Sequence, residues 1–284
     1  MDLAFYVDPM FPQYGDVAVA FARGCKVNGD RCRIEPADEQ KLDADVAVIG
    51  GLFDDTRAAA RAYRAAGRPI VFLDKGYGRI KSSDGGSVFW RASVNDTQPL
   101  AYFHKRPRPA DRLSSSGLSA ASKRRRGETV LFAGCSDRLH AWYDLPSPFD
   151  YASAVIKDIA RYTDRPVVYR PKPTCLGPGP VPGAKFSDTV KFRDDLDAAD
   201  LVVTYGAGVC LEAVAAGVPV LVLGNAVTRP VSETDIAKVA VPKFPSQDEV
   251  RLFLRNLSYC QWTLAEMRSG EAWADLRPIV EANP

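Results

Sequence analysis

The stretch LVVTYGAGVCLEAVAAGVPVLVLG, residues Leu201 to Gly224, predicts a strand, a glycine turn, a helix, a second turn and a second strand. Leu201 to Val203 is a short apolar run, Val209 to Ala216 is rich enough in alanine for a helix, and Val218 to Leu223 is a second apolar run. Together they form one βαβ unit. Units of this kind build parallel sheets that are covered by helices, so this stretch indicates an α/β fold.

The turn that opens this helix has the composition of an anion-binding site. Gly206 and Gly208 precede the helix, whose first N–H groups and positive dipole end point beyond the sheet edge. Glu212 follows in the first turn, where a carboxylate suits a ribose hydroxyl, so the pattern predicts a nucleotide diphosphate site. Two alternatives stay open. Many such turns bind no ligand, and a dinucleotide fingerprint would place a third glycine where Leu211 stands.

The composition of the 284-residue chain is that of an ordinary soluble protein with 46% hydrophobic and 25% charged residues, enough for two domains. Its net charge is only +2, but basic residues cluster between His104 and Arg126, which suits solvated loops or a polyanion such as DNA. The six cysteines show neither a CxxC pair nor zinc spacing, so we expect reduced, mostly buried thiols. Neither a basic-then-apolar leader nor an apolar run of about 20 residues is present, which favours a cytoplasmic protein.

Strands and helices alternate in both halves of the chain, which predicts two doubly wound Rossmann-like domains facing across a ligand-binding cleft. We expect an N-terminal domain over residues 1–126 with a basic loop at 104–126, a second domain over 127–255, and a helical tail over 256–284 that packs back on the first domain. The expected strands are Leu3–Val7, Val46–Ile49, Ile70–Leu73, Val88–Val94, Thr129–Phe132 and Val167–Arg170, and the expected helices are Gly15–Asn28, Asp55–Ala66, Tyr151–Thr163 and Phe192–Ala199. The tail is expected to be helical over Glu249–Glu281, and apolar residues recur at helical spacing from Asn256 to Trp273.

Small and cationic residues follow the strands of the second half. Because carboxyl ends of parallel strands meet at one edge, glycine turns and cations should converge there around an anion. The residues concerned are Gly134, Ser136, Arg138, Arg170, Lys172 and Arg229.

Several motifs resemble those of GT-B glycosyltransferases, in particular bacterial and phage enzymes related to capsule-type and DNA-modifying glycosyltransferases. The resemblance is carried by YRPKP (169–173), the stretch 198–224 and NLSYCQWTLAEMRSGEAW (256–273), with support from FYVDPMFPQYGD (5–16), FLDKGYGR (72–79), FWRASVND (89–96) and PRPADR (107–112). One departure is that relatives place small hydroxyl residues where this chain has Ala207 and Gly208. Phosphate binding would then rest on backbone N–H groups.

The resemblance implies a GT-B architecture and metal-independent transfer of a sugar from a nucleotide sugar, expected to be a UDP-sugar, to a hydroxyl. The general base should stand at a carboxyl strand end of the first domain, although an aspartate there is also commonly a helix cap. The candidates are Asp74, Asp8 and Asp54, with His104 and His140 as further options. The expected donor-binding residues are Gly134, Ser136, Arg138, Arg170, Lys172, Gly206, Ala207, Gly208, Glu212 and Arg229.

The preferred acceptor is a hydroxymethylated pyrimidine in DNA, as in phage DNA modification. Basic residues would contact the phosphate backbone, and Trp90, Tyr102 and Phe103 could stack on an extruded base. A surface polysaccharide or a lipid-linked sugar is the rival acceptor, and a nucleotide-sugar-binding protein without catalysis is a third hypothesis. The expected acceptor-binding residues are Tyr14, Tyr77, Arg79, Trp90, Arg91, Lys105, Arg106, Arg108, Lys123 and Arg124.

Overall fold

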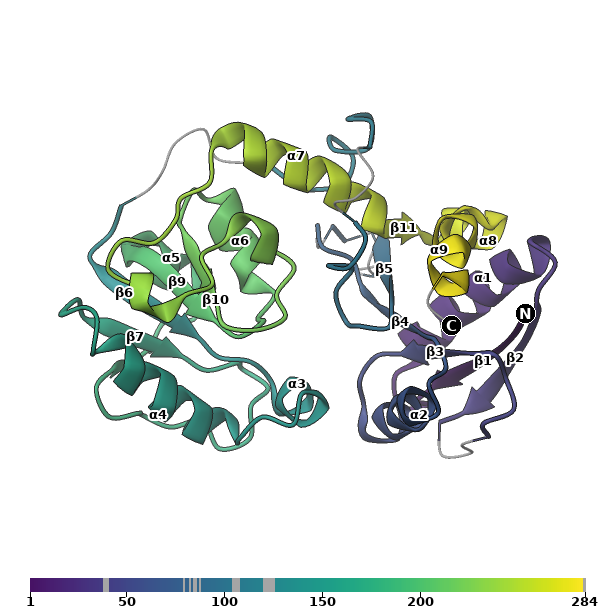
Figure 1. Ribbon diagram of the computed structural model, residues 1–284, viewed down its shortest axis with the longest axis horizontal. Helices are drawn as coiled ribbons and strands as arrows, with labels where there is room; N and C mark the ends of the chain where they lie inside the picture. The colour runs from purple at the N-terminus through teal and green to yellow at the C-terminus, as the bar shows by residue number, and fades with distance from the viewer. Residues whose placement is uncertain are drawn as a thin grey trace. The chain divides into compact units, whose positions relative to one another are not determined.

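The chain folds into two compact units (Figure 1). Unit 1 comprises Met1–Leu118 and Arg255–Pro284, and unit 2 comprises Ser119–Leu254. This computed structural model describes residues 1–37, 41–78, 80–81, 83, 86, 88–103, 108–119 and 126–282. The last 30 residues thus return to the unit that the N-terminal part of the chain builds.

Unit 1 is built on a six-stranded sheet of order β11-β5-β4-β3-β1-β2. The neighbours from β2 to β4 pair in parallel, whereas β5 is antiparallel to both β4 and β11. The central strands are continuous apolar runs because helices cover both of their faces. The strands are β1 (Asp2–Val7), β2 (Arg31–Pro36), β3 (Val46–Gly50), β4 (Ile70–Lys75), β5 (Phe89–Val94) and β11 (Gln261–Thr263).

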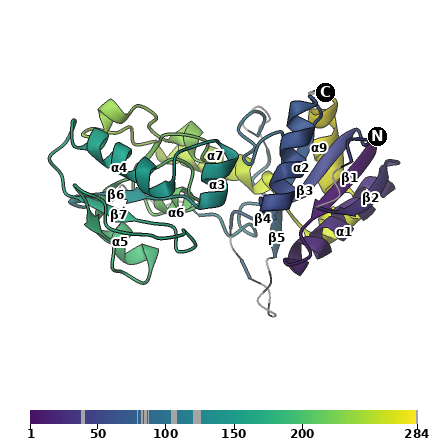
Figure 2. The ribbon, with the colours of Figure 1, turned by 90° about the horizontal axis from the view of Figure 1, so that it is seen from below.

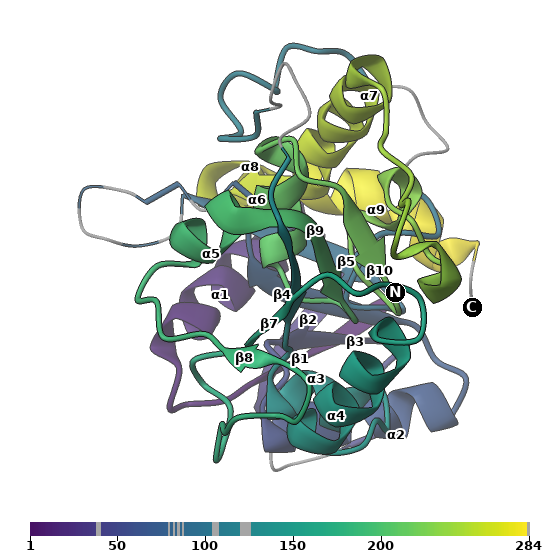
Figure 3. The ribbon, with the colours of Figure 1, turned by 90° about the vertical axis from the view of Figure 1, so that its left-hand side faces the viewer.

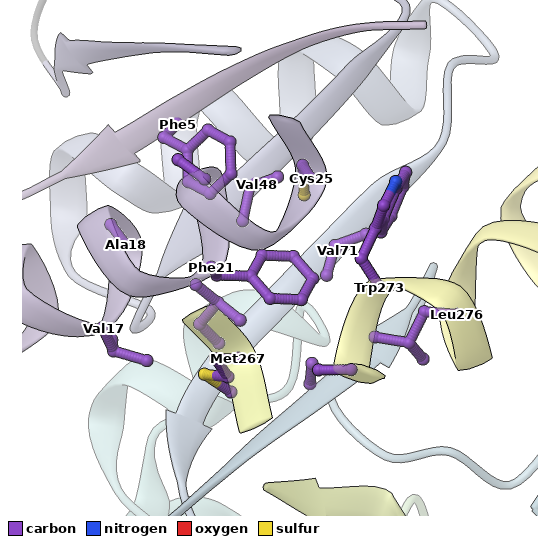
Figure 4. Packing of buried hydrophobic residues seen from close by; sticks show 14 of the residues in the cluster. Phe5, Val17, Ala18, Phe21, Cys25, Val48, Val71, Met267, Trp273 and Leu276 are labelled. Carbon is purple, nitrogen blue, oxygen red and sulfur yellow. The ribbon is translucent and has the colours of Figure 1, made fainter. Parts of the chain in front are cut away.

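Helices pack on both faces of this sheet, as expected for a doubly wound unit. Alternate strand residues such as Phe5 and Val71 join the core beneath α1 (Pro12–Val27), α8 (Leu264–Ser269) and α9 (Glu271–Glu281) (Figure 4). On the other face, Tyr6 meets Tyr63 of α2 (Asp54–Ala65), with ring centroids 5.9 Å apart. Figure 1 shows α2 below and the C-terminal helix α9 above the strands of this unit, and Figure 2 shows the same helices from below.

The two C-terminal helices are an integral part of unit 1. The Trp273 and Phe21 rings meet edge to face at 5.9 Å, and Met267 is fully buried in the same core. A Cβ on Gly24 would lie 1.9 Å from the carbonyl oxygen of Met267, so α1 and α8 touch backbone to backbone. Only glycine permits this approach. The close contact at Gly24 therefore helps to fix where residues 255–284 pack on unit 1.

The segment 256–273 is not the single helix that its apolar spacing predicts. Helix α7 (Gln247–Leu257) ends in a 3-10 turn (Ser258–Cys260), and β11 then pairs with β5 before α8 begins. A capping box between Thr263 and Glu266 starts α8, and Gly270, with φ +93°, ends it. The helix prediction is wrong here because these capping signals override the spacing of the apolar residues.

Unit 2 is built on a parallel five-stranded sheet of order β10-β9-β6-β7-β8. Its helices lie on both faces, with α4 on one side and α5 and α6 on the other (Figure 3). The bounds are β6 (Thr129–Ala133), α3 (Asp137–Trp142), α4 (Pro148–Ile159), β7 (Val167–Arg170), β8 (Lys185–Phe186), α5 (Phe192–Ala198), β9 (Ala199–Thr204), α6 (Val209–Ala215), β10 (Val220–Val222) and 3-10 turns at Arg229–Val231 and Ile236–Lys238. Two α/β units, one on a mixed sheet and one on a parallel sheet, confirm the predicted α/β fold class. Across the described ranges, the helices lack the length and apolar character that crossing a bilayer requires.

Candidate functional site

The carboxyl ends of β6 and β9 lie side by side where the strand order of unit 2 reverses. The chain passes from β6 to β7 on one side of the sheet and later returns to β9 on the other side. In open α/β sheets, ligands bind outside the carboxyl ends of the strands at such a switch point. The turns that follow these strands, 134–136 and 205–208, are therefore the first candidates for a ligand site.

A buried threonine holds these two turns together. The Thr204 hydroxyl donates to the Ala133 carbonyl oxygen at 2.8 Å and accepts from the Ala207 N–H at 3.1 Å. One side-chain oxygen thus connects the end of β6 to the glycine turn. Thr204 is not among the site residues that the sequence predicts, although a hydroxyl at the last position of an apolar strand is the signal that could reveal it.

The glycines after β9 and β10 allow the two turns to approach closely. A Cβ on Gly206 would lie 2.7 Å from the Asn225 carbonyl oxygen, and one on Gly224 would lie 2.2 Å from the Tyr205 ring. Gly208 is the N-cap of α6, and Glu212 lies exposed in its first turn. These glycines have a packing role whether or not a ligand binds.

Arg170 lies in an internal network. Its Nη1 donates to Asp195 at 2.7 Å and also to Ser187 and Thr189, which ties β7 to the segment before α5. The donors of the guanidinium are directed at protein acceptors. The structure therefore gives Arg170 a structural role where the sequence predicts a diphosphate ligand.

Lys172 is a better-placed cation than Arg170. It is half-buried, and within the described ranges its ammonium group has no hydrogen-bond or ion-pair partner. It lies beside the end of β6, because it follows β7 by two residues and Arg170 pairs with Ala133 in the sheet. Burial raises the pKa of the nearby Cys135 thiol, and hydrogen bonds from Gly206 and Thr204 and the Lys172 charge partly offset the rise. A cation beside the switch point could neutralise an anionic ligand.

The remaining predicted donor-side residues lie around the same edge with different partners. The Gly134 N–H donates to the Arg170 carbonyl oxygen at 2.9 Å, and the Ser136 hydroxyl accepts from the Leu139 N–H as the cap of α3. Arg138 is exposed on that helix. Arg229 is exposed too, and its Nη1 donates to the Gly224 carbonyl oxygen at 3.0 Å.

Three tyrosines gather beside the turn after β9. The Tyr205 ring lies 5.5 Å from that of Tyr143 and 5.8 Å from that of Tyr151. Asn225 Nδ2 donates to the Tyr143 hydroxyl at 2.5 Å. The buried His140 meets Tyr151 at 5.4 Å and pairs through Nδ1 with the Pro146 carbonyl oxygen at 2.7 Å. Tyr205 is distant in the chain from Tyr143 and Tyr151, so no local spacing could reveal that the three rings meet.

In unit 1, the three candidate aspartates lie at one edge of the sheet. Asp8 follows β1, Asp54 opens α2 after β3, and Asp74 lies near the end of β4, and these strands are parallel. Asp8 Oδ1 accepts from the Met10 N–H at 2.9 Å, whereas Asp54 is exposed and forms an ion pair with Arg57 at 2.9 Å. Their common edge follows from the topology of the sheet.

Asp74 is held by a cation and a hydroxyl. Arg91 Nη2 donates to Oδ2 at 2.6 Å, and the Tyr14 hydroxyl donates to Oδ1 at 2.7 Å. Burial by itself would raise the pKa of the Asp74 carboxyl, but the Arg91 charge and these hydrogen bonds hold that pKa below its ordinary value. Asp74 is therefore ionised at neutral pH and is a weak base.

Further polar and aromatic groups complete what we call the Asp74 cluster, formed by Tyr14, Asp74, Tyr77, Arg91 and Gln98. The Arg91 guanidinium lies 5.2 Å from the Tyr77 ring centroid. Gln98 Oε1 accepts from the Tyr77 hydroxyl at 3.1 Å and from Arg91 Nη1 at 3.4 Å. Four of these residues are ones that the sequence singles out, and the fold brings them together from different elements.

Two aromatic residues proposed to stack on a base are unavailable for that role. Trp90 is 4% exposed and Phe103 is 5% exposed, so neither presents a ring face to a ligand. Trp90 packs against Tyr14 at 5.5 Å, and Trp262 lies opposite it in the sheet. The stacking prediction is wrong for both residues because their rings belong to the core of unit 1.

Two arginines of the basic segment, Arg108 and Arg112, are paired within unit 1. Arg108 forms an ion pair with Asp275 at 3.3 Å, and Arg112 forms one with Glu266 at 2.8 Å. Both guanidinium groups lie 5.1 Å from the Tyr259 ring. Arg108 thus contacts protein where the sequence predicts an acceptor contact. The predicted residues Arg79, His104, Lys105, Arg106, Lys123 and Arg124 lie outside the described residues.

The described residues contain no group of three or more neighbouring His, Cys, Asp or Glu side chains that could hold a metal ion.

No family model and no curated protein matches this sequence. Among solved structures, it is similar to Thermosulfurimonas dismutans KpsC, beta Kdo 2,4 transferase, with 11% identity, a TM-score of 0.54, and coverage of 93% of this chain and 92% of that one. Weaker matches are the beta Kdo 2,7 transferase of the same KpsC (12% identity, TM-score 0.48, coverage 97% and 100%) and Anabaena Alr3699/HepE in complex with UDP-glucose (10%, 0.35, 98% and 100%). At such identities, the similarity shows the fold: this chain has the GT-B fold.

Proposed function

We propose that this chain is a glycosyltransferase that moves a sugar from a nucleotide-sugar donor, a UDP-sugar, to a hydroxyl acceptor. The observation that carries the proposal is the GT-B fold, shared along 93% of the chain with a structure described as a transferase. The polar switch point of unit 2 supports it, because this is where α/β sheets bind ligands.

The donor diphosphate would lie over the turns after β6 and β9. Lys172 and the backbone N–H groups of Gly206 to Gly208 would neutralise the charge that develops on the departing nucleotide. Glu212 would accept from the ribose hydroxyls, and Tyr205 belongs to the wall of the same edge. We propose that these groups act without a metal ion.

The acceptor would meet the carboxyl edge of unit 1. Of the three aspartates, Asp8 suits the role of general base best, because the Asp74 carboxylate is neutralised by Arg91 and Asp54 is paired with Arg57. The Asp74 cluster would then bind and orient hydroxyl groups of the acceptor. The proton of the acceptor hydroxyl moves to Asp8 while the acceptor oxygen bonds to the anomeric carbon of the sugar. The bond from that carbon to the diphosphate oxygen breaks, and the nucleotide diphosphate leaves.

A saccharide hydroxyl is the acceptor class that the described residues favour. Arg108 and Arg112 are paired inside unit 1, and Trp90 is buried, which removes three of the groups that would contact DNA. A hydroxymethylated pyrimidine in DNA is the second candidate, on the strength of the basic run SKRRRG at 122–127.

Donor binding and transfer can be measured separately. Thermal shifts with a panel of nucleotide sugars identify the donor, and mass spectrometry then follows sugar addition to oligosaccharides, hydroxymethylated DNA and unmodified DNA. Added sugar mass on an oligosaccharide supports the proposal, and added mass only on hydroxymethylated DNA selects the second acceptor. Donor binding with no transfer to any acceptor would indicate a non-catalytic binding protein. No shift with any nucleotide sugar would refute the donor site.

A further inference from the structure

A fully buried glutamine connects the C-terminal segment to the turn that follows β4. Gln261, in β11, is 0% exposed. Its Oε1 accepts from the N–H groups of Tyr77 at 2.6 Å and Gly78 at 3.3 Å, and its Nε2 donates to the Ser116 carbonyl oxygen at 3.0 Å. Three backbone groups from two segments are thus satisfied by one side-chain amide, which a buried polar group requires.

The turn KGYG, residues 75–78, fits closely around this amide. A Cβ on Gly76 would lie 2.9 Å from Gln261 Oε1, and a Cβ on Gly78 would lie 1.9 Å from the Ser116 carbonyl oxygen. The Gly76 N–H also donates to the Phe89 carbonyl oxygen at 2.8 Å. Glycine at both positions lets the backbone reach the amide, so the amide fixes the path of the turn.

Tyr77 connects this turn to the Asp74 cluster, because its backbone contacts Gln261 and its side chain contacts Arg91 and Gln98. While its N–H is held by Gln261, its ring lies beneath the Arg91 guanidinium at 5.2 Å, and its hydroxyl donates to Gln98. Arg91 in turn donates to Asp74 at 2.6 Å. A continuous series of contacts therefore runs from β11 through Tyr77 and Arg91 to the Asp74 carboxylate.

We propose that Gln261 is a positioning residue, which fixes Tyr77 and thereby the geometry of the Arg91–Asp74 pair. The inference rests on the proposed function only where that pair is assigned to acceptor binding. The groups that face Asp74 are Tyr14 from α1, Arg91 from β5, Tyr77 from the following turn and the N–H of Lys75 on its own strand. When Gln261 is lost, Tyr77 is released and Arg91 no longer has one fixed position over the carboxylate.

Two NMR measurements test this on the whole chain. In Gln261→Met, which keeps the volume and loses the hydrogen bonds, we expect roughly tenfold faster exchange of the Tyr77 and Gly78 amides, the size expected for one lost hydrogen bond. We also expect the pKa of Asp74, followed by its side-chain carbon resonance, to rise towards the ordinary value. Asp30 is the internal reference, because its partners Trp273 and Arg277 belong to α9 and not to the cluster.

Matched variants separate positioning from general loosening of the core. Ser258→Ala removes a buried hydroxyl of the same segment that donates only to the Arg255 carbonyl oxygen, and it should leave Asp74 unchanged. Gln261→Glu should restore slow exchange at a pH where the new carboxyl is protonated, because its C=O and O–H then reproduce the amide pattern. Sugar transfer enters none of these measurements, so they stand or fall independently of the proposed function.

The decisive measurement is the pKa of Asp74 in the variant whose Tyr77 and Gly78 amides exchange faster. A raised Asp74 pKa with an unchanged Asp30 pKa supports the proposal, and an unchanged Asp74 pKa overturns it. Equal shifts at both carboxyls would also overturn it, since they report general loosening. If Gln261→Met does not fold, Tyr77→Ala breaks the same series at its next step, and an unchanged Asp74 pKa there refutes the link.

Discussion

Replacing Thr204 with valine tests how the switch point of unit 2 is held together. Valine has nearly the same shape as threonine, but it can neither donate to the Ala133 carbonyl oxygen nor accept from the Ala207 N–H. Leaving one buried group unsatisfied costs about 1 to 3 kcal/mol. With both partners affected, we expect Thr204→Val to lower the stability of unit 2 by about 2 to 4 kcal/mol, which is roughly 1 M in the urea midpoint.

The units can be followed separately by fluorine NMR of 5-fluorotryptophan. Trp142 reports on unit 2, and Trp90, Trp262 and Trp273 report on unit 1. Only the Trp142 transition should move in Thr204→Val, and Thr204→Ser, which keeps the hydroxyl, should behave nearly as the wild type. Donor affinity should fall about tenfold, the factor that corresponds to about 1.4 kcal/mol of lost ordering. A Trp142 midpoint and a donor affinity equal to those of the wild type would refute the reasoning.

Further predictions concern Lys172 in unit 2 and the aspartates Asp8, Asp74 and Asp30 in unit 1. Lys172→Ala should weaken donor binding about tenfold or more, since a hydrogen bond to a charged group contributes about 1.5 to 3 kcal/mol; calorimetric titration of the donor measures this, with Arg170→Ala expected to show mainly a loss of stability. Asp8→Asn should lower kcat with donor affinity unchanged, and Asp74→Asn should raise the acceptor KM more than it lowers kcat, as initial rates against acceptor concentration would reveal. The pKa of Asp30, which burial would raise, is held low by the Met1 ammonium, Trp273 and Arg277; its stabilising effect is present above the unfolded pKa of about 3.9 and is lost as pH falls through the lower folded pKa. Acid unfolding followed by circular dichroism should therefore be less steep in Asp30→Asn.

The sequence predicts the α/β architecture well, because a strand that is buried on both faces of the sheet is a continuous run of apolar residues. The runs VAVI (46–49) and IVFL (70–73) predict buried strands without knowledge of any partner, and they lie in β3 and β4. The strand Arg31–Pro36 has no such apolar run, since it lies at the sheet edge, carries charged residues at every second position, and has no fully buried residue. Edge strands receive their conformation from a neighbour, which a single-sequence pattern does not contain.

The site was harder to predict because the partner of a charged side chain is set by the fold. Arg170 and Arg108 have the composition of ligand-binding cations, but Asp195 and Asp275 neutralise them from segments far along the chain. The role of Thr204 could not be predicted either, because its hydroxyl lies in an apolar strand and its acceptor, the Ala133 carbonyl oxygen, belongs to another strand end. Topology did place the carboxyl ends of the parallel strands, and with them the aspartates, at one edge.

The central claim is that a nucleotide sugar binds unit 2 at the carboxyl ends of β6 and β9. Hydrogen exchange of the whole chain with and without saturating UDP-sugar tests it most directly. The account predicts slower exchange in the turns 134–136 and 205–208 and in the segment around Lys172. Unchanged exchange in these segments, while the donor demonstrably binds elsewhere on the chain, would contradict it.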